Sequence, residues 1–157
     1  MTRLLYYGRG GRILDALLNE GCTRVEAVEN ADAVVVETYD NQSPNPIKRL
    51  SGTITLVREA LDKIENSTTS QMIVITDHSS TNGIKRKGTP TGAAIDGIHG
   101  FGSLTAEVLS RRAANLGIAT KVFRIRSDTT KEAIAEIKSS LNEPNEAPEY
   151  QVVTLGA

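Results

Sequence analysis

The chain has 157 residues, of which 39% are hydrophobic and 24% charged, a composition typical of one globular domain. Its net charge of -1 at pH 7 gives no general attraction to polyanions, so we expect neither nucleic acid nor a membrane as a partner. There is no signal-peptide pattern and no apolar run of about 18 residues. The single cysteine, Cys22, cannot form a disulfide within the chain. We therefore expect a cytoplasmic protein with one domain over 1–157 and Cys22 as a small buried residue.

Apolar runs of strand length alternate along the chain with segments of helical period. The predicted strands are 3–7, 32–38, 71–76, 119–125 and 150–155. The predicted helices are 12–20, 51–65, 103–116 and 129–141, the third ending at Gly117 and the fourth opening with the capping box "TTKE". The side chains predicted to face inward in the second and third helices are Ile54, Val57, Leu61, Ile64, Leu104, Val108, Leu109 and Ala113. This alternation predicts an α/β fold, a three-layer Rossmann-like domain with a mainly parallel sheet of five or six strands.

The segment 23–28 does not fit this alternation as a further parallel strand, and two alternatives remain. As a strand it cannot lie parallel beside the strand at 32–38, because too few residues remain for the crossover that parallel neighbours need. It is therefore either a strand paired antiparallel in a hairpin or a short helix. In the strand version Glu29 lies 21 residues after Gly8, where an acidic residue would accept the ribose hydroxyls of NAD. In the helix version, which we favour, Glu29 is a solvated charge.

A glycine-rich turn, "YGRGGR", joins the first strand to the first helix. Such a turn presents backbone N–H groups and the positive end of a helix dipole to an anion. Gly8, Gly10 and Gly11 supply the first two glycine positions of the dinucleotide fingerprint, but Ile13 stands at the third. The alternative is a tight turn that binds nothing. The residues predicted to contact an anion or cofactor are Gly8, Arg9, Gly10, Gly11, Arg12 and Thr38.

From "ADAVVVETYDN" onward the order of segments resembles the short-chain dehydrogenase/reductase family. "MIVITDHSS" is similar to the family's strand that ends in the catalytic serine, "AEVLSRRAANLGIATKVFRI" to its active-site helix and next strand, and "EYQVVTLGA" to its closing strand. The resemblance covers roughly 3–21 and 31–157 by segment order. It implies a Rossmann-like domain without the strand–helix–strand piece that carries the adenosine half of the cofactor, so we expect NAD or NADP to bind weakly or not at all. It also implies a homo-oligomer that packs through its long helices, including the one after residue 102.

The family's catalysis needs a Tyr-x-x-x-Lys pair, in which the lysine lowers the pKa of the tyrosine. In this sequence the two positions fall on Phe101 and Thr105, or on Ile98 and Gly102 if the helix ends are aligned. Neither choice supplies an acid or a base. We therefore do not expect hydride transfer by the family's mechanism.

The segment 77–102 is too long for an ordinary strand-to-helix connection and follows a strand whose carboxyl end should border a ligand site. Its candidate catalytic residues are Asp77, His78, Ser79, Ser80 and His99, of which the serines match the family's serine position or merely cap a strand end. Its basic cluster, Lys85, Arg86 and Lys87, could meet phosphate or lie in solvent. One cysteine and two distant histidines give no zinc spacing, so no metal is expected.

Two functions stay open. The first is a non-catalytic binding or assembly module that holds a nucleotide or another small anionic ligand, and the missing Tyr and Lys favour it. The second is a small atypical enzyme that acts on a nucleotide or small substrate through 77–102, including an NAD(P)-dependent oxidoreductase. The length and polarity of that segment favour the second.

Overall fold

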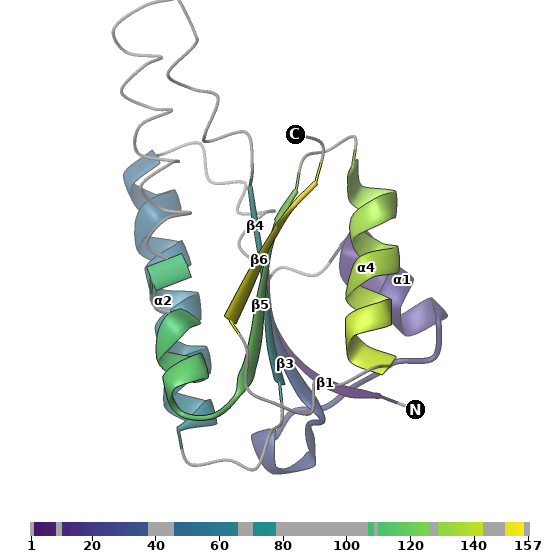
Figure 1. Ribbon diagram of the computed structural model, residues 1–157, viewed down its shortest axis with the longest axis horizontal. Helices are drawn as coiled ribbons and strands as arrows, with labels where there is room; N and C mark the ends of the chain where they lie inside the picture. Colours follow the sequence, from purple (N-terminus) through teal and green to yellow (C-terminus); the bar gives the residue numbers. More distant parts are fainter. Residues whose placement is uncertain are drawn as a thin grey trace, which may run out of the picture.

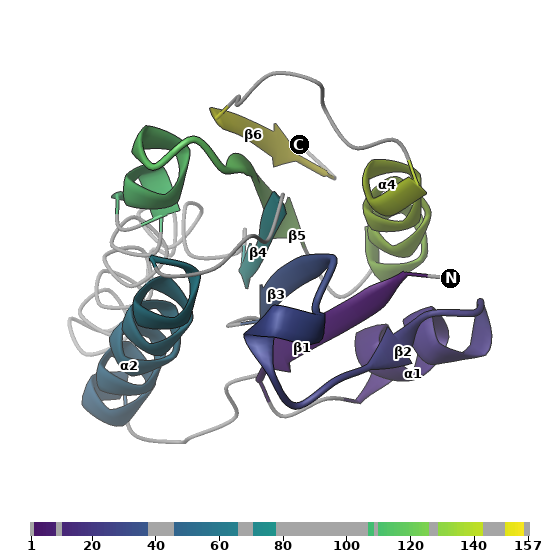
Figure 2. The same cartoon turned by 90° about the horizontal axis from the view of Figure 1, so that it is seen from below.

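A six-stranded sheet with every strand parallel to its neighbours runs through the middle of the protein, and helices cover both of its faces (Figures 1 and 2). The computed structural model describes residues 2–8, 11–37, 46–65, 71–77, 107–108, 110–125, 129–142 and 150–155. The strand order is β2-β1-β3-β4-β5-β6. The predicted parallel α/β fold of the Rossmann-like type is confirmed.

The strands are β1 (Arg3–Tyr7), β2 (Thr23–Arg24), β3 (Ala33–Glu37), β4 (Gln71–Asp77), β5 (Ala119–Ile125) and β6 (Tyr150–Thr154). The helices are α1 (Arg12–Asn19), the short 3-10 helix η1 (Val28–Asn30), α2 (Pro46–Ile64) and α4 (Thr130–Asn142). Residues 107–108 and 110–115 are also helical, and we call them the 107–115 segment.

The predicted strands agree with the observed ones to within one residue at each end, because each is a run of apolar, mostly β-branched residues with both faces covered. The second helix begins earlier in the chain than the sequence predicted. α2 starts at Pro46, five residues before the predicted start at Ser51. Proline has a fixed φ and no N–H, which suits the first position of a helix, so the turn-like composition of this stretch was misleading.

The segment at 23–28 pairs with β1 and not with β3. Thr23 donates its N–H to the carbonyl of Thr2 at 2.9 Å, and Val25 donates to Leu4 at 2.8 Å, in parallel register. The predicted antiparallel hairpin is wrong, because β1 lies between β2 and β3 and the chain crosses over β1 through η1. Glu29 is exposed on η1, as the helical alternative predicted.

Each face of the sheet carries its own apolar cluster. η1, α2 and the 107–115 segment cover one face, and α1 and α4 cover the other (Figures 1 and 2). The α2 side buries Val34, Val36, Val57, Leu61, Ile64, Val74 and Val122, among others. The α1 side buries Leu4, Ile13, Leu17, Val35, Ile75, Phe123 and Ile137, among others. Cys22 packs only partly buried at the rim of the second cluster, which is less burial than we predicted.

The last crossover has the opposite hand to the other four. The chain moves from β1 outward to β2 and then in the reverse direction through β3, β4, β5 and β6. The first crossover moves toward β2 and its helix, α1, lies on one face. The next three move in the reverse direction, and η1, α2 and the 107–115 segment lie on the other face, so these four crossovers have the same hand. α4 returns to the face of α1 without a change of direction, so the β5–α4–β6 crossover breaks the usual right-handed rule. In this position Ala133, Ile137 and Leu141 of α4 join the apolar cluster that contains Ile73, Ile75 and Phe123.

The 107–115 segment ends as the sequence predicted but faces differently. Gly117 has φ +89°, and Ile118 donates its N–H to Ala113 at 3.1 Å, which is the Schellman closure of a helix. Ala113 is buried as predicted, whereas Val108 is 61% exposed and the prediction that it faces inward is wrong. Val108 stands five residues before Ala113, half a turn away from the buried side of the helix.

Arg3 and Asp32 tie the amino ends of β1 and β3 together. Asp32 accepts the backbone N–H of Arg3 at 2.8 Å and its guanidinium at 3.0 Å. These hydrogen bonds hold the pKa of Asp32 below its usual value and raise the pKa of Arg3. The pair is about half exposed, so water screens much of the attraction.

Two adjacent leucines on α1 test the packing of this face. Leu17 is fully buried and Leu18 is 39% exposed. We expect Leu17→Ala to lower the free energy of unfolding by about 2–5 kcal/mol, since it leaves a cavity between α1 and the sheet. The control, Leu18→Ala, should cost less than about 1 kcal/mol. Urea denaturation measures both, and equal losses would contradict the described orientation of α1.

The Arg3–Asp32 pair predicts a pH dependence. Because the pKa of Asp32 is lowered by folding, its carboxylate adds stability above the ordinary aspartate pKa, and this contribution is lost as the pH falls through the folded-state value. Asp32→Asn should therefore cost at most about 1 kcal/mol at pH 7 and progressively less below about pH 4. Urea denaturation of both proteins between pH 7 and pH 2.5 measures this gap, and a gap that widens in acid would contradict the assignment.

Candidate functional site

The strand order reverses between β1 and β3, and this is the point where open parallel sheets bind ligands. Beyond it the chain leaves β1 toward α1 on one face, whereas α2, which follows β3, covers the other face. The loops after the two strands therefore diverge at the carboxyl edge of the sheet. The residues that border this switch point are Gly8, just after β1, and Glu37, at the end of β3.

Gly8 and Glu37 lie in van der Waals contact across the switch point. Tyr7 pairs with Val36 in the β1–β3 register, so the next residues, Gly8 and Glu37, stand at the same height. Gly8 has φ +147°, a region that side chains disfavour. A Cβ on Gly8 would lie 2.9 Å from the Glu37 carbonyl oxygen and 3.0 Å from its Cβ. Only glycine lets the chain leave β1 this close to β3.

The amino end of α1 follows directly. Gly11 is its N-cap residue, with φ 106°, and within the described part of the chain no side chain caps this end. The first helical hydrogen bond runs from Asp15 to the carbonyl of Gly11 at 2.9 Å, which leaves the N–H groups of the first turn outside the helical pattern. Arg12, the first helical residue, is exposed. This end of the helix has the backbone donors and the dipole that attract an anion.

A buried carboxylate lies beside this turn. Glu37 is 2% exposed, and the hydroxyl of Tyr6, itself 3% exposed, donates a hydrogen bond to Glu37 Oε2. Arg24 donates to the carbonyl of Tyr6 at 3.2 Å and places its guanidinium 5.9 Å from the Tyr6 ring centre. Glu37, Tyr6 and Arg24 thus link β3, β1 and β2 on the α1 side of the sheet.

Glu37 is not among the residues predicted from the sequence to contact a ligand. The sequence feature that could have identified it is an acidic residue directly after the apolar run "AVVV". A charged residue at the carboxyl end of a buried parallel strand lies at the edge of the sheet where ligands bind. We had assigned that position to the neighbouring Thr38, which lies outside the described residues.

The structure brings together part of the predicted anion site. Gly8, Gly11 and Arg12 border the turn between β1 and α1, whereas Arg9 and Gly10 lie outside the described residues. Asp77 ends β4, two strands away from β1. The other predicted catalytic residues, His78, Ser79, Ser80 and His99, lie outside the described residues, as do Lys85, Arg86 and Lys87. The enzyme hypothesis that rests on 77–102 stays a prediction.

A dinucleotide fits the described residues only in part. The turn after β1 suits a phosphate, but Ile13, at the third fingerprint position, is 1% exposed in the apolar cluster under α1. β2 is only two residues long and leads into η1, where Glu29 is exposed. Among the described residues, the end of β2 therefore has no acidic side chain in the position that would accept the ribose hydroxyls of NAD.

These features define a parallel α/β protein of the Rossmann-like type with an open helix end and a buried carboxylate at its switch point. A scan against protein-family models finds no matching family, and a search of curated proteins finds no match.

Gly8 and Gly21 form a matched pair that tests the close approach at the switch point. Both have positive φ, and a Cβ on Gly21 would meet nothing within 4 Å. Alanine at either position should cost about 1–2 kcal/mol for the backbone conformation. Gly8→Ala should cost at least about 1 kcal/mol more, since its methyl collides with Glu37. Chemical denaturation compares the two, and equal losses would show that Gly8 does not contact β3.

Proposed function

We propose that this protein is a trimmed relative of the short-chain dehydrogenases/reductases that serves as a non-catalytic binding or assembly module. Its ligand is a small phosphate-bearing molecule, such as a nucleotide, held at the turn between β1 and α1. The observation that carries the proposal is the placement of Gly8 and the open amino end of α1 at the topological switch point.

The geometry of the turn supports an anion as the ligand. Gly8 brings the backbone close to β3, and Gly11 begins α1 with no side-chain cap from the described residues. Backbone N–H groups and the helix dipole there favour a phosphate, and Arg12 can add a charge-assisted hydrogen bond. A single helix dipole contributes only about 0.3–1 kcal/mol, so it does not replace a missing adenosine pocket.

Glu37 supports weak binding of highly charged ligands. A Cβ on Gly8 would lie 3.0 Å from the Cβ of Glu37, and the Glu37 side chain is 2% exposed. Two like charges roughly 6 Å apart repel by about 2–3 kcal/mol near a protein surface. A ligand with one phosphate group suits this edge better than a pyrophosphate, because a negatively charged Glu37 repels a second negative charge.

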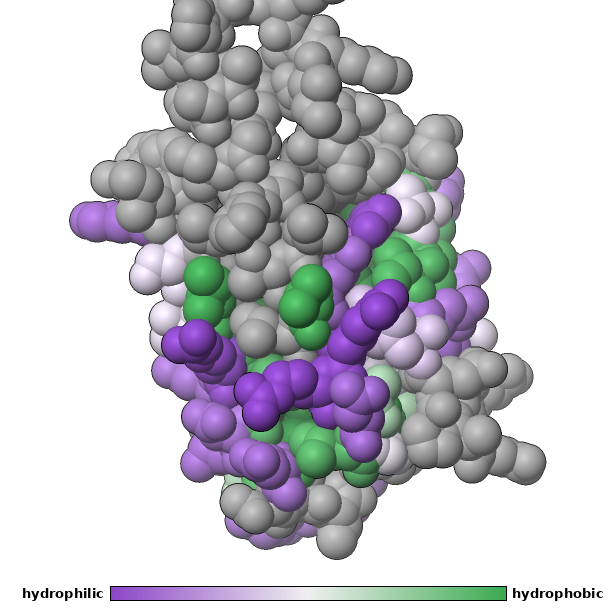
Figure 3. All heavy atoms as spheres, turned by 60° about the vertical axis from the view of Figure 1, so that its left-hand side comes forward, coloured by the Kyte–Doolittle hydropathy of each residue, from purple (hydrophilic) through white to green (hydrophobic). Residues whose placement is uncertain are grey.

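We also infer a homo-oligomer, in which the helices on the α2 side make the contact. Val108 is 61% exposed and Leu116 is 51% exposed, and both lie at the outer surface of that layer. On this side of the molecule hydrophobic areas lie between hydrophilic ones (Figure 3). As for membranes, no helix among the described residues combines the length and the apolar character needed to cross one.

Calorimetric titration of inorganic phosphate, NAD and NADP tests the ligand site. We expect phosphate to bind weakly and neither dinucleotide to bind with micromolar affinity. Glu37→Gln should strengthen phosphate binding about tenfold, since it removes a negative charge and keeps the shape of the side chain. The matched control is Glu29→Gln, which removes an equal charge from the exposed η1 and should change nothing.

Two results would overturn the proposal. If phosphate affinity were the same in wild type, Glu37→Gln and Gly10→Val, the turn would not be the site. If NAD or NADP bound with micromolar affinity and Gly10→Val abolished this, the cofactor-dependent enzyme would become the better explanation.

A further inference from the structure

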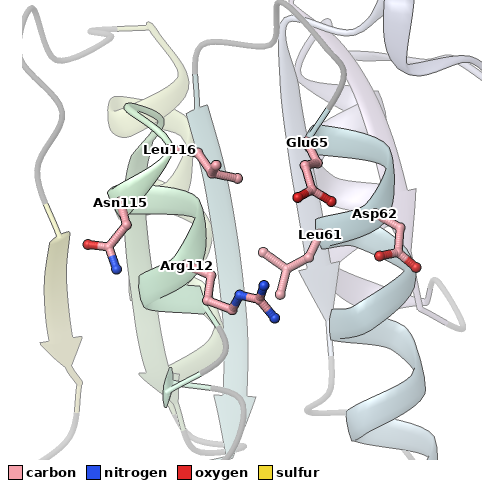
Figure 4. A pocket seen from close by; sticks show the side chains of 6 residues that line it. All are labelled: Leu61, Asp62, Glu65, Arg112, Asn115 and Leu116. Atoms are coloured by element: carbon pink, nitrogen blue, oxygen red, sulfur yellow. The ribbon is translucent and has the colours of Figure 1, made fainter.

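A small hollow opens between α2 and the 107–115 segment. Its volume is about 180 Å³, and the residues that line it are Leu61, Asp62, Glu65, Arg112, Asn115 and Leu116 (Figure 4). Typical pockets for drug-sized molecules are larger, at about 300–1,000 Å³. At about 30 Å³ per molecule of liquid water, the hollow equals about six waters, a volume that suits a ligand as small as a free amino acid.

The base of the hollow is apolar. Leu61 is 8% exposed and belongs to the apolar cluster under α2, whereas Leu116 is 51% exposed. Both side chains point into the space between the two helices (Figure 4). An apolar group bound there would cover part of both leucines, and the removal of this apolar surface from water is favourable.

The rim of the hollow carries opposite charges on opposite sides. Asp62 and Glu65 are three residues apart near the carboxyl end of α2, so they are neighbours on one side of that helix. Arg112 reaches toward α2 from the 107–115 segment (Figure 4). None of these three charges forms an ion pair within 4.0 Å in the described part of the chain, where the pairs are Arg3–Asp32, Glu107–Arg124 and Glu20–Lys138. The hollow therefore has a negative and a positive side, and both can meet a ligand.

We propose that this hollow binds the zwitterion of a small apolar α-amino acid. The ammonium group of the ligand faces Asp62 and Glu65, and the carboxyl end of α2 favours a positive charge at the same place. The carboxylate of the ligand faces Arg112, whose guanidinium can donate two parallel hydrogen bonds to it. The apolar side chain packs on Leu61 and Leu116. This site is separate from the turn between β1 and α1 and goes beyond the proposed function.

Ligands of other charge leave part of the lining unmatched. A dianion would face the carboxylates of Asp62 and Glu65, and a dication would face Arg112, so each meets a repulsion that a zwitterion avoids. An uncharged apolar molecule would displace water from these charged groups without replacing its hydrogen bonds, which costs free energy. A zwitterion with a short apolar side chain matches both charges and the two leucines.

Titration of the isotope-labelled protein with L-leucine, followed by amide NMR spectra, tests the site. We expect a millimolar Kd, as suits a ligand this small in an open hollow, and shifts of the amides of Leu61, Glu65, Arg112 and Leu116. Three related compounds each lack one group of leucine: 3-methylbutylamine lacks the carboxylate, 4-methylpentanoate lacks the ammonium group, and glycine lacks the side chain. The first two should bind about threefold more weakly than leucine, and glycine about tenfold more weakly.

Two variants assign the charges of the ligand to the two sides of the hollow. Arg112→Gln should weaken leucine binding about threefold and should not weaken the binding of 3-methylbutylamine, which has no carboxylate. Glu65→Gln should weaken leucine binding by a similar factor and should not weaken the binding of 4-methylpentanoate. The matched controls are Lys131→Gln and Glu136→Gln, which make the same charge changes at exposed positions of α4 and should leave leucine binding unchanged. The amide spectra also verify that each variant is folded.

Three results would overturn the proposal. One is that leucine, at concentrations far above a millimolar Kd, shifts none of the amides around the hollow. Another is that leucine and the three related compounds bind equally well, which would show that the hollow does not select a zwitterion. The third is that Arg112→Gln and Glu65→Gln both bind leucine as the wild type does.

Discussion

The reversal of strand order at β1 is the constraint on which the rest of this structure depends. β1 lies between β2 and β3, so it is buried on both edges along its amino half, and the chain must leave it on the α1 side while β3 leaves toward α2. The two exits separate only if the backbone after β1 clears β3. Gly8 makes this clearance, at a contact with Glu37 where no side chain has room. The open helix end, the buried carboxylate and the ligand edge all follow from this one crossing.

The same crossing sets the chemistry of the candidate site. In the proposed function, an anion at the amino end of α1 gains backbone hydrogen bonds and a favourable dipole. The Tyr6 hydroxyl donates to the Glu37 carboxylate, and Arg24 donates to the Tyr6 carbonyl, so these contacts link β3, β1 and β2.

The two faces of the sheet have different roles. On the α1 side, the exceptional crossover to β6 brings α4 beside α1, where Lys138 and Glu20 form an ion pair at 2.6 Å, and this face is closed. On the α2 side, Glu107 pairs with Arg124 at 2.5 Å and accepts the Tyr150 hydroxyl at its carbonyl, which fixes the 107–115 segment to β5 and β6. Val108 and Arg112 of that segment, and Leu116 just after it, are exposed.

The sequence by itself determined the layers of this protein. The runs "AVVV" and "MIVI" are apolar at every position, which is typical of strands covered on both faces. The glycines at 21 and 117 end helices because they adopt positive φ at little cost. Neither the partner of residues 23–24 nor the face of α4 could be deduced, since both depend on contacts between distant segments and not on local periodicity. The pairing of Glu37 with Tyr6 across 31 residues, and the exposure of Val108, are likewise decided by which strand lies beside which, and only the tertiary structure fixes that.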